Sequence, residues 1–253
     1  MKAAQLALGI VFLVPAALFA GGFAHDDNFI VYAPDQPLAD QVLAKAETYR
    51  QELAKELLGK ELPARAGRTI ITVDVSTTKD SGFTWPIDHP DRRFHNTWLT
   101  TSRERAVGST LRHEICHVVL NTQFPQALPT WVEEGLASRN DDATRLRSGR
   151  QIIASMAQGG WSGLGGLLDA RTIGSADQTS YAMATSLTEY LLSQGDVGKL
   201  LQFAADGKGG NWDGAVQQHY GSRGVADLEA KWHAWAAAGT QHASAATWPR
   251  EYR

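Results

Sequence analysis

The chain of 253 residues has a single cysteine, Cys116, so no disulfide can form within it. It has no long run of lysine or arginine and its formal charge is only −3, so nothing in its charge favours binding to nucleic acid. No internal repeat is visible. The composition, with 43% hydrophobic and 20% charged residues, is typical of a globular domain that can bury a core large enough to fold without disulfides.

The first residues differ in composition from the rest of the chain. A short positive start precedes an apolar run over 6–24, and polar residues return at His25. This order is typical of a signal peptide, with small residues at Ala20 or Ala24 marking the cleavage site. We therefore expect 1–24 to be a signal peptide and the domain to be secreted or periplasmic. An uncleaved membrane anchor is the alternative, because about 20 apolar residues can span a bilayer.

Beyond this segment, the pattern predicts mixed strands and helix first and a helical half afterwards. Runs of β-branched and apolar residues predict strands at 29–32, 69–76 and 94–100. Apolar residues at helical spacing predict helices at 38–58, 102–121, 143–157, 179–194, 197–206, 211–219 and 226–238. Ser102 is the expected N-cap of the helix at 102–121. The domain is thus expected over 25–240, followed by a loose tail at 241–253.

The segment at 81–88 is expected to be either an edge strand or a surface loop. Pro86 lacks the N–H that a central strand needs, which confines the segment to a sheet edge or to irregular structure. An edge strand beside a cleft can pair with an extended peptide.

The most informative stretch is the apolar helical pattern around His113, Glu114 and His117, which reads H-E-x-x-H. Residues four apart on a helix project from one face, so the two imidazoles can bind one zinc ion. The glutamate lies about 100° further round the helix, where it can reach a water molecule beside the metal and serve as a general base.

Two histidines leave zinc short of ligands, because a catalytic site needs three protein ligands and an open position. Sixteen residues separate His117 from Glu134, and prolines break the helical pattern between them. The chain can therefore turn back and bring a carboxylate to the metal from a short helix, whose expected N-cap is Thr130. Glu134 is the expected third ligand, and Glu133 is expected at the surface or behind the ligands. Zinc would lower the pKa of its water, Glu114 would accept the proton and pass it to the leaving amine, and hydroxide would attack a polarised carbonyl.

The motif H-E-x-x-H at 113–117, followed by W-x-x-E-G-x-A at 131–137, resembles gluzincin metallopeptidases, specifically the exported bacterial proteins of the peptidase-MA-like family. The similarity extends more loosely over about 100–240 and includes a segment at 181–192 like the helix that packs behind the site in such proteins. It implies zinc as the cofactor and the glutamate directly before the glycine, Glu134, as the third ligand.

Other residues near the expected site have less specific roles. Tyr181 is a candidate to donate a hydrogen bond to the oxyanion, as a tyrosine does in related gluzincins, with core packing as the alternative. Thermolysin-like members carry an aspartate four residues after the third ligand, where this chain has Ser138, so Asp141 and Asp142 are the candidates for orienting a ligating histidine. Cys116 is expected to be a small buried apolar residue. The eight tryptophans are expected in the core and in cleft walls.

These patterns predict an α+β fold: a zincin-like metallopeptidase domain with a small N-terminal β-sheet, an active-site helix and a helical C-terminal part. The expected function is zinc-dependent hydrolysis of peptide bonds in a peptide or protein substrate outside the cytoplasm. Two alternatives remain: an exported binding or scaffold protein with a structural or vestigial zinc site, and a zinc amidase acting on cell-wall peptide. Glu114 argues against the first, since a purely structural site has no need of a base beside the metal.

Overall fold

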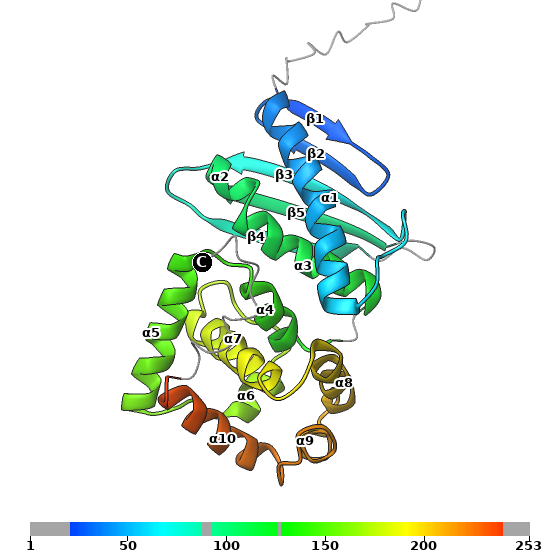
Figure 1. Cartoon of the computed structure of the whole chain (residues 1–253). Helices are drawn as coiled ribbons and strands as arrows, with labels where there is room; N and C mark the ends of the chain where they lie inside the picture. Colours follow the sequence, from blue (N-terminus) through cyan, green and yellow to red (C-terminus); the bar gives the residue numbers. More distant parts are fainter. Residues whose placement is uncertain (1–20, 88–92, 126–127, 240–253) are drawn as a thin grey trace, which may run out of the picture.

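The computed structural model describes residues 21–87, 93–125 and 128–239, which form a sheet layer with helices on one face and a group of helices beneath it (Figure 1). The fold is therefore a mixture of α and β structure, as predicted. Most of the predicted signal peptide, residues 1–20, and the predicted tail at 241–253 lie outside the described residues. Within the described ranges, no helix has both the length and the apolar character needed to cross a membrane.

A five-stranded sheet with the order β1-β2-β3-β5-β4 forms the upper layer. Its strands are β1 (Gly22–His25), β2 (Phe29–Ala33), β3 (Gly67–Val75), β4 (Ser81–Ile87) and β5 (Arg93–Thr101). β2, β3 and β5 run parallel to one another, and β1 and β4 pair antiparallel at the two edges. The three strand predictions are confirmed, and the segment containing Pro86 is an edge strand rather than a loop, where a missing N–H does little harm.

β1 lies in the segment predicted to end the signal peptide, and no strand was expected there. Gly22 pairs with Ala33 and sits so close to the start of the first helix that a Cβ atom would lie 2.0 Å from the carbonyl oxygen of Asp35. Cleavage after Ala24 would remove most of this strand, whereas cleavage after Ala20 leaves it whole.

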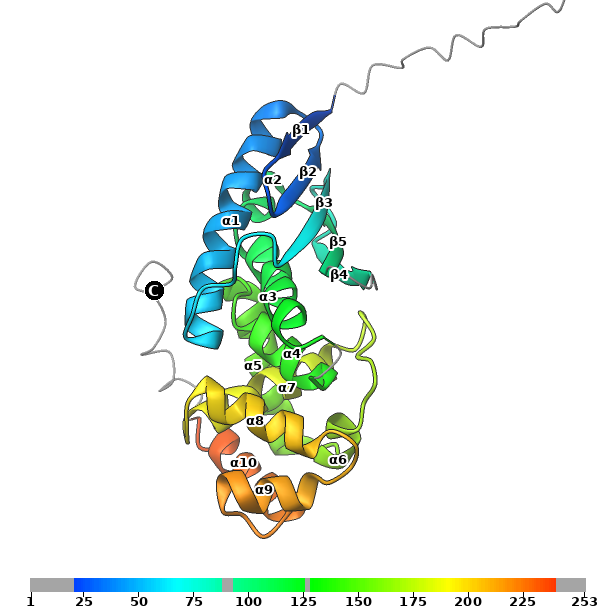
Figure 2. The same ribbon diagram turned by 90° about the vertical axis from the view of Figure 1, so that its right-hand side faces the viewer.

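Helices α1 (Gln36–Leu58), α2 (Arg103–Ala106) and α3 (Ser109–Gln123) lie on one face of the sheet (Figure 2). Asp35 caps the start of α1 and Gly59 ends it in the left-handed conformation, with φ of 67°. The prediction of a single helix at 102–121 was wrong. Ser102 caps α2, as expected, but Gly108 has a non-helical backbone (φ −120°, ψ −128°) that separates α2 from α3.

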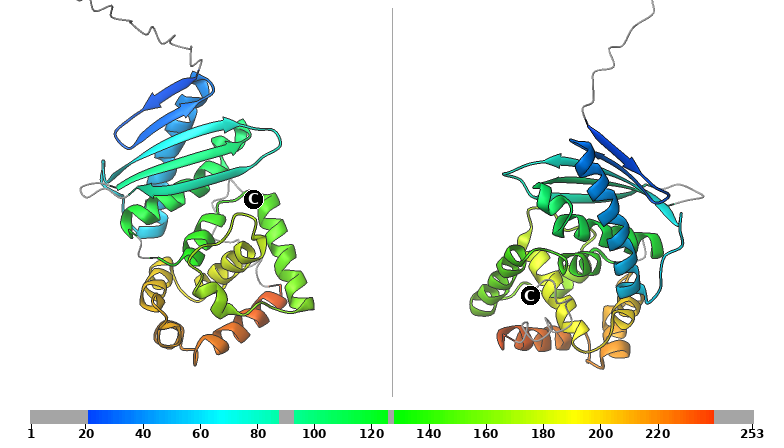
Figure 3. Two further views of the ribbon diagram at one scale, coloured as in Figure 1. Left: turned by 180° about the vertical axis from the view of Figure 1, so that it is seen from behind. Right: turned by 45° about the horizontal axis from the view of Figure 1, so that its top comes forward.

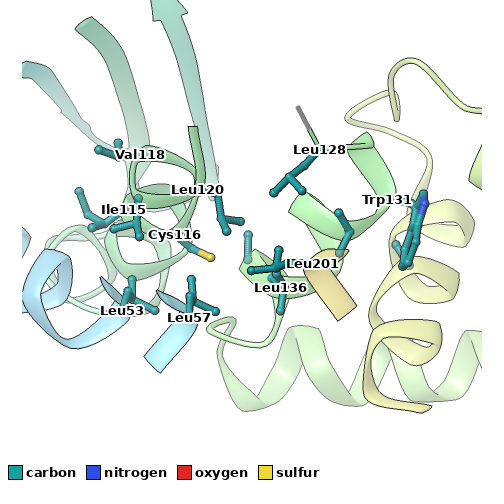
Figure 4. Packing of buried hydrophobic residues seen from close by; sticks show 14 of the residues in the cluster. Leu53, Leu57, Ile115, Cys116, Val118, Leu120, Leu128, Trp131, Leu136 and Leu201 are labelled. Atoms are coloured by element: carbon teal, nitrogen blue, oxygen red, sulfur yellow. The ribbon is translucent and has the colours of Figure 1, made fainter. Parts of the chain in front are cut away.

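The core beneath the sheet is made largely by α1 and α3 (Figure 4). Leu53 and Leu57 of α1 face Ile115 and Cys116 of α3, and all four are buried. Burying each of the larger side chains stabilises the fold by about 1.5–3 kcal/mol. The prediction that Cys116 is a buried apolar residue is confirmed; burial raises the pKa of its thiol, which keeps it protonated.

The lower layer contains the remaining described helices: α4 (Thr130–Ser138), α5 (Ala143–Gly159), α6 (Leu164–Leu168), α7 (Gln178–Leu192), α8 (Val197–Gly207), α9 (Trp212–Tyr220) and α10 (Val225–Ala237). α7 lies at the centre, packed against α4 and α5 (Figure 1). Thr130 is the first residue of α4 and not its N-cap, which is Pro129; the Thr130 hydroxyl instead donates to the Arg171 carbonyl. α6 was not predicted, because glycines obscure its short apolar pattern.

The opposite face of the sheet, which the left view of Figure 3 shows from behind as a ribbon, carries exposed aromatic side chains. Trp85 of β4 is 58% exposed and Trp98 of β5 is 43% exposed, so the expectation that tryptophans lie in the core and cleft walls fails for these two. It fails because residues alternate between the two faces of a strand, and in the described part of the chain no helix covers this face. Trp131, Trp212 and Trp232 are buried as expected.

Candidate metal centre

The candidate ligands come from two helices that meet where the sheet layer joins the lower helices (Figure 1). α3 supplies His113 and His117, four residues apart, and α4 supplies Glu134. Residues 110–120 of α3 are all buried, because the helix is packed between the sheet and the lower layer. The two histidines are therefore shielded from bulk water, and Glu134 on α4 is partly buried.

The three side chains converge on one point. His113 Nε2 lies 3.3 Å from His117 Nε2 and 3.7 Å from Glu134 Oε2, and His117 Nε2 lies 3.6 Å from the same oxygen. This buried His-His-Glu group could hold a metal ion. Ligand atoms bound tetrahedrally at about 2.0–2.1 Å lie about 3.3 Å from one another, so the observed separations fit a single ion after small movements.

Asp141 orients one of the histidines. His113 Nδ1 lies 3.0 Å from Asp141 Oδ1, and donation of the Nδ1 proton to this carboxylate leaves Nε2 free to ligate a metal. Of the two aspartates considered from the sequence, the structure selects this one. Asp142 instead caps α5 and pairs with Arg105.

The charges of the cluster stabilise one another. Burial by itself lowers the pKa of His113, but Asp141 and Glu134 raise it well above the ordinary value. Burial by itself raises the pKa of Glu134, but the two histidines reverse this and hold it well below its usual range. Glu134 is therefore ionised, which is the form that binds a metal.

Glu114 is held by the edge strand. Its side chain is 3% exposed, and Thr84 of β4 donates a hydrogen bond of 2.7 Å from Oγ1 to Glu114 Oε2. Gly82, two residues earlier on the same face of β4, makes room for the carboxylate, since a Cβ atom there would lie 2.2 Å from Glu114 Oε1. The base candidate thus rests against the strand that borders the cavity.

A cavity of about 530 Å³ opens beside these groups. Its wall includes His113, Glu114 and Tyr181, together with Ser81 and Gly82 of the edge strand. Burial raises the pKa of Tyr181, and the charges of nearby carboxylates raise it further, so its hydroxyl stays protonated and can donate a hydrogen bond. The place of Tyr181 on the cavity wall favours a hydrogen bond to the oxyanion over core packing.

Glu133 takes no part in the cluster. Of these two neighbouring glutamates, only Glu134 belongs to the cluster with both histidines. Burial raises the pKa of Glu133, which favours its neutral form. This agrees with the expectation that Glu133 is not a ligand.

Comparison of this chain with protein-family models, with curated proteins and with solved structures finds no match. The chemistry of the site is therefore inferred from the residues themselves.

Sequence reasoning missed the residues that hold Glu114. Gly82 and Thr84 occupy alternate positions of β4 and share the face turned towards α3. The alternation was visible in the sequence, but nothing there indicated that β4 lies against α3. Asp80 was also missed: it accepts hydrogen bonds from Thr101 and Thr110 and pairs with Arg145, which ties the start of β4 to α5.

Proposed function

We propose that this chain is an exported zinc-dependent metallopeptidase with a zincin-like fold. The observation that carries the proposal is the convergence of His113, His117 and Glu134, with His113 and the neighbouring Glu114 on the wall of one cavity. Two imidazoles and one carboxylate, with a fourth position open towards a cavity, are the ligand set of catalytic zinc sites. A zinc ion held there would polarise a substrate carbonyl and make a water molecule acidic.

The protein's own groups suit the remaining steps of peptide hydrolysis. Glu114, fixed by Thr84, would accept a proton from water at the cavity and donate it to the leaving amine. Tyr181 would donate a hydrogen bond to the oxygen on which negative charge develops. β4 is an edge strand whose residues Ser81 and Gly82 line the cavity, so an extended substrate can pair with it.

The test is to purify residues 21–253, measure the zinc bound per chain, and follow hydrolysis of unstructured peptides and of peptidoglycan fragments. We expect about one zinc ion per chain and cleavage that Glu114→Gln reduces by at least about a thousandfold without loss of metal. Glu134→Gln should lose metal, whereas the neighbouring Glu133→Gln should retain both metal and activity.

Four outcomes would change the proposal. Protein that binds no zinc would overturn it, and cleavage that survives Glu114→Gln would overturn the mechanism. Activity confined to peptidoglycan fragments would identify an amidase with the same residues. A metal-loaded protein inactive on all substrates would favour a scaffold role.

A further inference from the structure

The cavity contains a second carboxylate that the proposed mechanism does not use. Glu189 lies on α7, eight residues beyond Tyr181, and both side chains line the cavity. Eight residues of α-helix span about 12 Å, so Glu189 leaves α7 well away from Tyr181, the oxyanion-binding candidate. Its carboxylate is therefore placed to contact a side chain of a bound substrate rather than the scissile bond.

Glu189 is buried without a partner. It is 8% exposed, and in the described part of the chain its carboxylate forms no hydrogen bond or ion pair. Arg139 and Arg150 act on it by charge and lower its pKa, and Arg150 lines the same cavity, but the effect of burial is larger than theirs. Burial raises its pKa to about 7. A buried carboxylate without a partner is costly to the fold, and such groups are commonly found where a ligand supplies the partner.

The other acidic groups on the cavity wall are already engaged. Asp80 pairs with Arg105 and Arg145, Asp141 is bonded to His113, and Glu114 accepts from Thr84. Among the described residues of the wall, Glu189 is thus the carboxylate that is left to bind a cation.

The wall of the cavity also suits the stem of a long basic side chain. Ile152, Ile153 and Ala182 line the same cavity and present apolar surface. Methylene groups of lysine or arginine pack well against such surface while the charged end reaches a carboxylate.

We propose that the part of the cavity around Glu189 is a subsite for a cationic side chain, lysine or arginine, of the peptide substrate, with the Glu189 carboxylate as its ion-pair partner. This inference rests on the proposed peptidase function and adds the class of substrate to it.

The test compares peptides that differ only in whether one position carries lysine, norleucine or glutamate. The varied position is placed in turn at each site on both sides of the cleaved bond. At one position, the wild-type protein should show a kcat/KM for lysine about tenfold or more above that for norleucine. Glu189→Gln should bring this ratio close to one, and Glu189→Lys should shift the preference to glutamate. Glu61→Gln, the same change at an exposed glutamate after α1, should keep the wild-type ratio.

Binding provides a second readout that does not need cleavage. Calorimetry with Nα-acetyl-lysine amide should detect binding to the Glu114→Gln protein and none when Glu189→Gln is added. Peptides cleaved without a lysine preference, or a preference that survives Glu189→Gln, would overturn this inference alone. Failure to cleave any peptide would overturn the proposed function, and the calorimetry would still decide whether Glu189 binds a cation.

Discussion

At the scale of single residues, the base candidate is positioned by side chains of β4 that the H-E-x-x-H motif does not include. Glu114 contacts Gly82 and accepts a hydrogen bond from Thr84. The motif predicts which residues take part, because helix geometry fixes their directions. It does not predict what stands opposite them, because that depends on which strand lies over α3.

Substituting these two strand residues should lower activity to different degrees. Thr84→Val removes one hydrogen bond to a carboxylate, worth about 1.5–3 kcal/mol, so kcat/KM should fall roughly 10- to 100-fold. Gly82→Ala should lower kcat/KM further, since its methyl group would take the place of the carboxylate. Steady-state kinetics and metal content measure both effects.

Zinc content should remain at the wild-type level in both variants, because neither touches His113, His117 or Glu134. Gly165→Ala is the matched control: it lies in α6, with open space around the added methyl group, and should leave kinetics unchanged. Wild-type kcat/KM in Gly82→Ala would show that Glu114 is not the base or is not held by β4.

Glu189 should make the stability of the protein depend on pH. Its pKa is about 7 in the folded protein and 4.5 ordinarily, so the folded state binds the proton more tightly than the unfolded state. The free energy of unfolding should therefore fall as the pH rises from about 4.5 through 7. Glu189→Gln, which resembles the neutral form, should be more stable than wild type by about 2–3 kcal/mol at pH 8, with little difference at pH 4.5.

Urea denaturation at the two pH values measures this difference. Glu61→Gln should show no gain in stability at pH 8, because that glutamate is exposed and paired with Lys55. A Glu189→Gln protein that is less stable than wild type at both pH values would show that Glu189 has a stabilising partner.

At the scale of helices and strands, periodic patterns predicted most elements, and the exceptions have identifiable causes. α1, α5 and α7 have apolar stripes bounded by capping aspartates, so their positions follow from the sequence. Three features did not follow. β1 has a composition that also suits a signal peptide, α6 is too short to show a period, and the break at Gly108 lies inside a continuous helical pattern.

The packing of α4 against α7 places the third ligand. Gly135 follows Glu134, and a Cβ atom at Gly135 would lie 2.1 Å from Thr188 Oγ1 and 2.7 Å from the carbonyl oxygen of Ala184. Gly135→Ala should therefore push the helices apart, lower the free energy of unfolding by about 1–3 kcal/mol, and weaken zinc binding. Denaturation and competition with a chelator measure the two effects.

A second substitution tests whether a steric clash with α7 causes the loss of stability in Gly135→Ala. Adding Thr188→Ala to Gly135→Ala removes the nearest obstructing atom and should recover part of the stability. Gly149→Ala, on α5, meets only Ala182 Cβ at 3.9 Å and should be tolerated. Unchanged zinc affinity in Gly135→Ala would show that Glu134 does not depend on this contact.

At the scale of the whole molecule, a bound metal would join the two layers. His113 and His117 lie on α3, which packs against the sheet, whereas Glu134 lies on α4, which packs against α7. A ligand that binds only the folded state at about 100 times its Kd stabilises it by about 2.7 kcal/mol. Zinc should raise the Tm of the wild-type protein and have no such effect on His117→Ala, as followed by calorimetry with and without a chelator.

The amino-terminal boundary of the domain is the last prediction at this scale. β1 pairs with β2 and contacts α1, and its inward residues Gly22 and Ala24 are buried. A protein starting at His25 would leave the edge of β2 unpaired and expose part of the α1 surface, so it should be less stable than one starting at Gly21. We therefore expect export to cleave after Ala20, which intact-mass measurement of the exported protein would show. A mature protein starting at His25, with a free energy of unfolding equal to that of the longer form, would show that β1 is not needed by the fold.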